Sequence, residues 1–247
     1  MEEAVTYESR DHIAIVTINR PKQMNAINEE VELGLASAWR RFNESDDRVG
    51  ILTGAGEKAF SAGRDRDAKG YPDYRKFAPG VDIEIEKPLI AAVSGWCIGG
   101  ALTLVQMCDL CVATENAKFV YPEAKVGFAG GLVASLAVRI PHKVAMELML
   151  LGEPLDAQRA YQIGFVNRIV PAGQHLAEAL AMAAKIADNA PLVLRMLKQF
   201  SNDTLPKGPV ERASRALKEI DRVYGSEDYR EGRDSFSEKR TPKYRGR

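Results

Sequence analysis

The chain has 247 residues, of which 45% are hydrophobic and 28% are charged, a composition typical of a globular protein. A chain of this length buries about 70–75% of its unfolded surface, so one large domain needs neither disulfides nor a metal for stability. The 34 basic and 34 acidic residues cancel, which argues against binding to nucleic acid or to an anionic membrane surface.

The cysteines and histidines do not form a metal-binding pattern. Cys108-x-x-Cys111 has a spacing found in zinc sites, but there is no second pair, and the three histidines are scattered. A closed zinc site needs four clustered ligands, so we predict no metal. Three cysteines in apolar sequence instead indicate reduced, buried thiols and a cytoplasmic protein. The polar N-terminus and the lack of a long apolar run predict neither a signal peptide nor a membrane span.

The first half of the chain alternates predicted strands and helices. In chain order we expect a strand over 13–19, a helix over 29–42 capped by Asn28, a strand over 49–56, a loop over 58–65, a strand over 89–95, a helix over 99–107, and a strand, turn and short strand over 110–124. This alternation indicates an α/β layer architecture.

The second half, from about Val133, is predicted to be mainly helical. We expect helices over 142–152, 156–164, 173–188, 190–201 and 207–223, with a brief strand over 165–171. The last residues are basic, with no acidic residue after Glu238. We therefore divide the chain into a core over 1–190 and a C-terminal helical region over 191–247.

Two glycine-containing turns follow predicted strands. Gly99-Gly100 opens a helix, whose first N–H groups have no partner within the helix, and Ala62-Gly63 lies in "FSAGRD". Glycine lets another group approach the backbone closely, and parallel strands bind ligands at their carboxyl edge. Two such N–H groups could together stabilise an oxyanion. Close helix packing is the alternative explanation for the glycine pair.

A carboxylate lies near a second glycine pair in "YPEAKVGFAGGL". Glu123 follows Pro122, seven residues before Gly130-Gly131. In an apolar cleft the pKa of such a carboxyl rises, so it can transfer protons near neutral pH; a solvated loop glutamate is the alternative. The chain has no G-x-x-x-x-G-K-[ST] or G-x-S-x-G motif, which argues against a P-loop or a serine hydrolase.

Seven segments in this order resemble the crotonase (enoyl-CoA hydratase/isomerase) superfamily, and together they cover nearly the whole chain. They are "NRPKQMNAI", "FSAGRD", "KPLIAAVSGWCIGGALTLVQMCDLCVA", "AKFVYPEAKVGF", "LGEPLDAQRAYQIGFVNRIVP", "APLVLRMLK" and "EKRTPKYRGR". The resemblance implies an α/β fold with a spiral of ββα turns and C-terminal helices that form a homotrimer or a hexamer. It also implies coenzyme A thioesters as substrates, with no separate cofactor.

The resemblance further implies roles for individual residues. The backbone N–H groups of Arg64 and Gly100 would stabilise a thioester enolate, and Glu123 would be the acid and base. The substrate and its CoA arm would lie against Ala26, Ala62, Arg64, Asp65, Arg66, Asp67, Gly99, Gly100 and Gly131. The basic tail, with Lys239, Arg240, Lys243, Arg245 and Arg247, would meet CoA phosphates, within one subunit or across a subunit boundary, or remain solvated.

One position departs from the pattern of the hydratases that this chain resembles. They use two glutamates, and Thr103 stands where the first belongs. One glutamate suffices to move a proton between carbons, so we expect isomerase-like chemistry, such as Δ3-Δ2 enoyl-CoA isomerisation, or a related non-hydratase step. The alternatives are a weakened or specialised hydratase, with water held by Thr103 and Glu123, and a non-catalytic CoA-binding protein.

Three further features bear on this expectation. Thr103 could simply pack with its hydroxyl bonded back to the helix. Asp82, Glu84 and Glu86 lie in a segment shorter than in typical hydratases, and one of them could supply a second acid; solvated charges are the simpler interpretation. A small residue is commoner at position 64, and we expect the Arg64 side chain to point outward.

Overall fold

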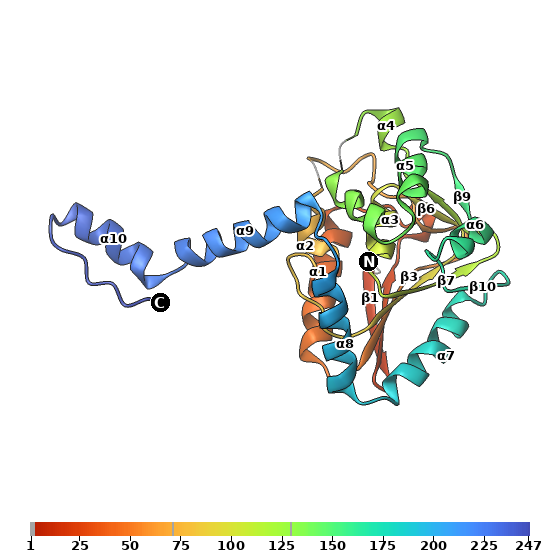
Figure 1. Ribbon diagram of the computed structural model, residues 1–247, viewed down its shortest axis with the longest axis horizontal. Helices are drawn as coiled ribbons and strands as arrows, with labels where there is room; N and C mark the ends of the chain where they lie inside the picture. Colours follow the sequence, from red (N-terminus) through yellow and green to blue (C-terminus); the bar gives the residue numbers. More distant parts are fainter. Residues whose placement is uncertain (1–2, 71, 129) are drawn as a thin grey trace.

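From β3 to β8, consecutive strands alternate between two sheets, and this alternation winds the chain into a spiral (Figure 1). The computed structural model describes residues 3–70, 72–128 and 130–247. Three successive pairs, β3–β4, β5–β6 and β7–β8, each place their first strand in the larger sheet and their second in the smaller. A helix follows each pair. The predicted α/β fold with ββα turns is confirmed.

The larger sheet has six strands in the order β1-β2-β3-β5-β7-β10, and the smaller has four in the order β4-β6-β8-β9. Neighbours are parallel except β1 with β2 and β8 with β9. The strands are β1 (Val5–Arg10), β2 (Ile13–Ile18), β3 (Val49–Gly54), β4 (Ala59–Ser61), β5 (Leu89–Val93), β6 (Trp96–Ile98), β7 (Leu110–Thr114), β8 (Lys118–Val120), β9 (Leu155–Asp156) and β10 (Arg168–Val170).

The helices follow the predicted positions, with three additions, α2, α4 and α10. They are α1 (Glu29–Glu44), α2 (Tyr74–Phe77), α3 (Gly100–Gln106), α4 (Glu123–Val126), α5 (His142–Leu151), α6 (Ala157–Gln162), α7 (His175–Ala187), α8 (Pro191–Thr204), α9 (Pro209–Tyr224) and α10 (Glu227–Ser237), with 3-10 helices over Pro21–Gln23 and Gly131–Val138. The sequence predicted none of these three additions as a helix. The predicted loop over 58–65 is partly wrong, because Ala59–Ser61 pairs with β6 as β4.

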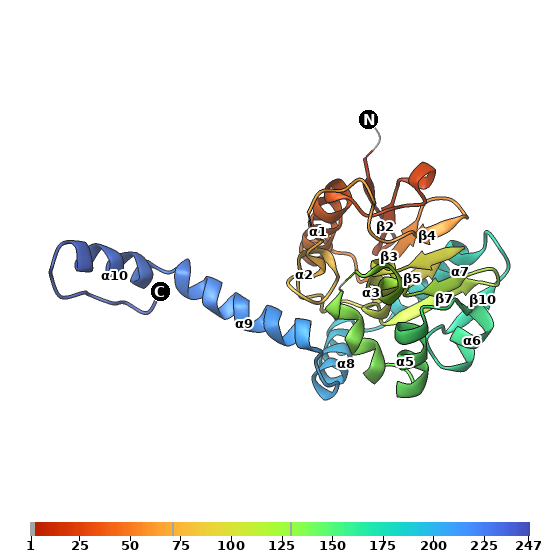
Figure 2. The same cartoon turned by 90° about the horizontal axis from the view of Figure 1, so that it is seen from above.

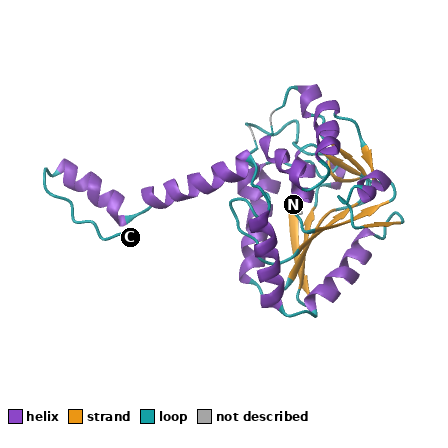
Figure 3. Ribbon diagram, in the orientation of Figure 1, coloured by secondary structure: helices purple, strands orange, loops and turns teal. Residues whose placement is uncertain are grey.

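Both faces of the larger sheet are covered by helices, as Figures 2 and 3 show. α1 buries Val31, Leu35, Trp39 and Phe42 against one face, and this three- to four-residue spacing is typical of a helix with one apolar side. The side chain of Asn28 accepts a hydrogen bond from the Val31 N–H at 3.1 Å, so the predicted N-cap is confirmed. The small residues of α7 pack against the other face.

The indole of Trp39 connects α1 to the short helix α2. Its Nε1–H donates a hydrogen bond to the carbonyl oxygen of Phe77 at 2.8 Å, and both side chains are fully buried. The ring of Phe77 packs against that of Tyr74, with centroids 4.7 Å apart. The core therefore fixes the position of α2.

The C-terminal helices α9 and α10 extend away from the body of the chain (Figure 1). Part of the basic tail folds back on α10, where the Arg240 guanidinium pairs with Glu231 and that of Arg247 pairs with Glu227. Within one chain the tail thus forms ion pairs with α10. No helix of the described residues combines the length and apolar character needed to cross a membrane.

The three cysteines are unpaired. Cys97 and Cys111 are buried and Cys108 is half-buried. Burial raises the pKa of each thiol, to about 12 for Cys108. Buried thiols of this kind are packing groups rather than nucleophiles. Among the residues that the structure describes, no three His, Cys, Asp or Glu side chains are grouped closely enough to hold a metal ion.

Replacing Trp39 should show how far the indole hydrogen bond stabilises the fold. Trp39→Phe leaves the buried carbonyl of Phe77 without its donor, and we expect a loss of about 1–3 kcal/mol in the free energy of unfolding. Urea denaturation measures this loss. Trp96, which is 39% exposed, provides the control, and Trp96→Phe should cost less than about 0.5 kcal/mol. Equal effects of the two substitutions would contradict this assignment.

Candidate active site

Three segments that the sequence singled out meet at one edge of the smaller sheet. β4 leads into Ala62-Gly63, β6 leads into Gly99-Gly100, and β8 leads to Glu123. These strands are parallel neighbours, so their carboxyl ends lie at the same edge. A cavity of about 170 Å³ opens there, lined by side chains that include Tyr74, Thr103, Tyr121 and Glu123.

Glu123 is the buried carboxylate of this cavity. It begins α4 and is 8% exposed. A Cβ placed on Gly99 would lie 2.6 Å from Oε1 of Glu123, so a side chain at this position would displace the carboxylate. Within the described residues, Oε2 has no hydrogen-bond partner. Burial raises the pKa of Glu123 to about 7, against the small opposing effect of its own backbone N–H.

The two glycine turns touch each other beside this carboxylate. Gly63 has a φ of +77°, and a Cβ placed there would lie 3.5 Å from the nitrogen of Gly100. The N–H of Ile27 donates to the Gly63 carbonyl at 2.7 Å, and the N–H of Asp65 donates to the Ile27 carbonyl at 2.9 Å. Arg64 lies between Gly63 and Asp65 and forms a parallel bridge with Ile27. In such a bridge the N–H of Arg64 points away from Ile27.

The N–H groups of Arg64 and Gly100 are available to a ligand. Gly100 is the first residue of α3, where an N–H has no acceptor within the helix. Neither N–H donates to another of the described residues. The contact between the two turns is thus compatible with an oxyanion hole, whose role stays a prediction.

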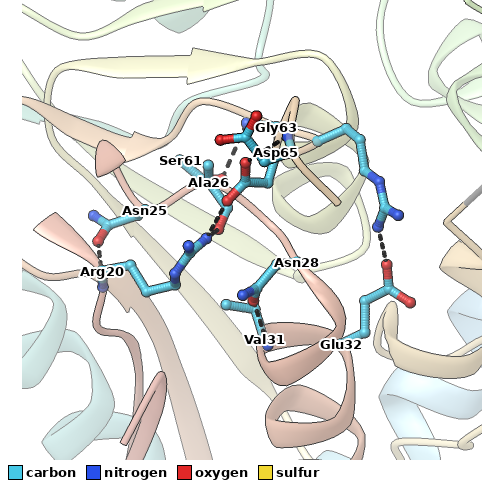
Figure 4. Close-up of polar contacts among 11 residues, drawn as sticks. Arg20, Asn25, Ala26, Asn28, Val31, Glu32, Ser61, Gly63 and Asp65 are labelled. Carbon is cyan, nitrogen blue, oxygen red and sulfur yellow. Dashed lines mark hydrogen bonds and ion pairs between the residues drawn. The ribbon is translucent and has the colours of Figure 1, made fainter. Parts of the chain in front are cut away.

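The segment after Gly63 is held by two arginines (Figure 4). The Arg20 guanidinium donates to Asp65 at 2.7 Å and to the Ala26 carbonyl at 2.6 Å, and it holds the pKa of the Asp65 carboxyl below its usual range. Arg64 pairs with Glu32 and donates to the Lys69 carbonyl at 2.7 Å. The expectation that Arg64 points outward is wrong, because its side chain fastens the loop to α1.

The other predicted site residues fall into two groups. Thr103 and Gly131 line the cavity, and the hydroxyl of Thr103 donates to the Gly100 carbonyl at 2.6 Å, the back-bond that the sequence allowed. Arg66 and Asp67 are exposed and lie outside the cavity wall.

The acidic segment does not supply a second acid. Asp82 accepts a hydrogen bond from Ser214, while Glu84 and Glu86 are exposed. None of the three lines the cavity.

Two tyrosines and an aspartate of the cavity wall were not among the predicted site residues. A Cβ placed on Gly100 would lie 1.5 Å from the Tyr74 hydroxyl oxygen, so this side chain rests on the Gly100 backbone. The Tyr121 hydroxyl donates to the Gly130 carbonyl at 2.5 Å. Asp73 is paired with Arg75, which lowers the pKa of the aspartate. Asp73 and Tyr74 lie outside the quoted segments, whereas Tyr121 lies in "AKFVYPEAKVGF", two residues before Glu123.

Comparison with known proteins shows which family this chain resembles along nearly its whole length. The family model for enoyl-CoA hydratase/isomerase matches residues 8–247. An (E)-benzylidenesuccinyl-CoA hydratase of Thauera aromatica is 37% identical over 98% of this chain and 99% of its own length. A carnitinyl-CoA dehydratase of Salmonella typhi is 35% identical over 100% of both chains.

Solved structures of the same family are also similar to this chain over its whole length. A probable enoyl-CoA hydratase/isomerase from Mycobacterium abscessus superposes with a TM-score of 0.77 at 40% identity, with 100% of both chains covered. A carnitinyl-CoA dehydratase from Mycobacterium avium 104 has the same TM-score of 0.77 at 36% identity and the same coverage.

The raised pKa of Glu123 should appear in the pH dependence of stability. The folded protein keeps the proton up to about pH 7, whereas the unfolded chain loses it near 4.5. Ionisation therefore costs stability progressively between these pH values, and the cost is constant above them. We expect Glu123→Gln to unfold at higher urea than the wild type at pH 8 and at a similar urea concentration at pH 4.5. The exposed Glu84→Gln is the control, and a difference that does not change with pH would contradict the burial effect.

The Arg64 side chain should protect its loop from proteolysis. Arg64→Ala removes the contacts to Glu32 and to the carbonyl of Lys69, and we expect tryptic cleavage after Lys69 to accelerate about tenfold through local opening. Mass spectrometry of timed digests measures the rate. Arg66→Ala, at an exposed position of the same loop, should leave it unchanged. Equal rates in Arg64→Ala and the wild type would show that Arg64 does not hold the loop.

Proposed function

Because the chain belongs to the enoyl-CoA hydratase/isomerase family, we propose that it adds water reversibly to the double bond of an enoyl-CoA thioester. The observation that carries the proposal is the buried carboxyl of Glu123, with a pKa of about 7, in contact with Gly99 and next to the turn that holds the Gly100 N–H. The hydratase and dehydratase relatives match the full chain. They favour the hydratase alternative over the isomerase-like reaction that Thr103 suggested.

One carboxylate is sufficient for this reaction. Ionised Glu123 takes a proton from a water molecule as the water oxygen bonds to the β-carbon, and the electrons of the double bond move to the thioester oxygen. The N–H groups of Arg64 and Gly100 stabilise the resulting enolate. The enolate then takes the proton from Glu123 at its α-carbon, which restores the carboxylate. Dehydration is the reverse, with loss of the β-hydroxyl as water.

The CoA arm of the substrate would cross the fastened loop. Ala26 and Ala62 lie where Arg20 and the Met24 carbonyl hold the loop to the chain before α1, and residues 64–67 continue from there. We propose that the pantetheine and adenine follow this surface toward the cavity. The CoA belongs to the substrate, so no separate cofactor enters the proposal.

Thr103 also supports a second candidate reaction, the isomerisation of a 3-enoyl-CoA. With a hydroxyl in place of the first glutamate, the cavity has one ionisable group suited to moving a proton between the γ- and α-carbons of a 3-enoyl-CoA. The same oxyanion hole would stabilise the dienolate formed on the way. This isomerase reaction needs no bound water, and the assays below separate it from hydration.

We further propose that helices of region 191–247 join copies of this chain into a trimer, alone or paired as a hexamer. Large apolar side chains are exposed on the described surface of α8, α9 and α10, and Phe236 is 87% exposed. On α9, Leu217, Ile220 and Tyr224 share one face by their spacing. α9 also begins at the cavity, where Val210 contacts Gly131, so assembly and the site are adjacent.

Turnover on a panel of CoA thioesters tests the reaction. We expect hydration of a 2-enoyl-CoA, with kcat/KM rising about tenfold per pH unit below pH 7 and constant above, since the ionised form of Glu123 is the base. Glu123→Gln should lower kcat about 10²- to 10⁴-fold, and Thr103→Glu should raise hydration. Conversion of 3-enoyl-CoA without hydration would favour the isomerase. Binding without any turnover would show a non-catalytic CoA-binding protein.

Light scattering tests the assembly. We expect three or six copies per particle, and the pair of substitutions Ile220→Asp and Tyr224→Asp should shift the protein to monomers by placing charge in an apolar contact. Arg222→Asp, at a position with an 83% exposed side chain on the same helix, should leave the mass unchanged. A monomeric wild type would contradict the proposed contacts.

A further inference from the structure

The hydroxyl of Tyr74 lies where the two parts of the site meet. Its oxygen rests on the backbone of Gly100, and it lines the same cavity as Glu123 and Thr103. Trp39 and the packed ring of Phe77 fix the helix that carries it. The position is therefore set by the buried core rather than by a surface loop alone.

The cavity contains several hydrogen-bond acceptors and few available donors. Glu123 accepts hydrogen bonds when ionised. The Thr103 hydroxyl already donates a hydrogen bond to the Gly100 carbonyl, so towards a ligand the Thr103 oxygen can only accept. The Tyr121 hydroxyl is bonded to the Gly130 carbonyl, and Arg75 is paired with Asp73. Among the described side chains that line the cavity, Tyr74 alone has a hydroxyl donor that is not bonded to the protein.

Tyr74 keeps its proton at neutral pH. Its pKa is raised first by burial and then by the nearby negative charges of Glu123 and Glu32. A neutral phenol remains a hydrogen-bond donor. Its proximity to Glu123 means that a molecule between them could give a proton to the carboxylate and accept one hydrogen bond from the phenol.

The oxygen of the water that is added or lost requires a hydrogen-bond donor of this kind. In the proposed hydration, water gives one proton to Glu123 and can place its other hydrogen on Thr103, which leaves a lone pair for a donor. In dehydration the departing oxygen gains negative charge and needs a donor more strongly. On the basis of the proposed function, we propose that Tyr74 is a substrate-contacting residue whose hydroxyl donates a hydrogen bond to the β-oxygen of the substrate.

A binding cycle tests this contact without requiring turnover. In Glu123→Gln proteins, calorimetry gives the affinities for 3-hydroxybutyryl-CoA and for butyryl-CoA, which lacks the β-oxygen. We expect a preference for the hydroxy compound that Tyr74→Phe lowers about three- to tenfold, as for loss of one hydrogen bond. Tyr121→Phe removes the other phenolic hydroxyl of the cavity and should keep the preference, because that hydroxyl is bonded to Gly130.

The outcomes separate this inference from the proposed function. An unchanged preference in Tyr74→Phe, or equal changes for both ligands, would overturn the role of Tyr74, whether or not the wild type hydrates crotonyl-CoA. Tighter binding of both ligands would show that the phenol obstructs the site and would overturn it as well. A Tyr74-dependent preference in a protein whose wild type hydrates no enoyl-CoA would support the contact and reject the reaction. Failure to bind either ligand would overturn both proposals.

Discussion

The site depends on keeping the Glu123 carboxyl out of water without giving it a charged partner. A cation at this position would lower the pKa of the carboxyl and leave a weak base, whereas a second carboxylate would raise it further through repulsion. In this chain burial raises the pKa of Glu123 to about 7. Thr103 is a neutral residue of the same cavity, so it adds no charge that would repel the ionised carboxylate. One group can then both take and return a proton near neutral pH.

The spiral of strands brings this carboxyl to the backbone donors. β4, β6 and β8 are parallel neighbours, so the loop after Ser61, the turn at Gly99 and the start of α4 emerge along one edge. Each contact there is tight, since Gly63 touches the backbone around Gly100 and Gly99 touches Glu123. The side chains of Arg20 and Arg64 then hold the loop from the outer side. Short strands thus position the candidate site, while α1 and α7 pack against the larger sheet.

The sequence predicted the parts of this arrangement that have a local cause. Asn28 predicts the start of α1, and the β-branched runs predict β2, β3 and β5. The glycine turns indicate where backbone segments come into close contact. β1 and α10 were missed because exposed, polar residues give little periodic signal. The positions of Tyr74 and of the Arg64 side chain were also missed, because both follow from tertiary contacts with α1 and α3. The hydratase and dehydratase relatives favour hydration over the isomerase-like reaction that Thr103 suggested, because a residue missing from one position does not by itself identify the reaction.

A crystal structure with bound butyryl-CoA would test the central claim most directly. The account predicts a thioester oxygen about 2.7–3.1 Å from the nitrogens of both Arg64 and Gly100, with the Glu123 carboxylate facing the α-carbon. A thioester bound elsewhere, or a Glu123 carboxylate facing no part of the acyl chain, would contradict it.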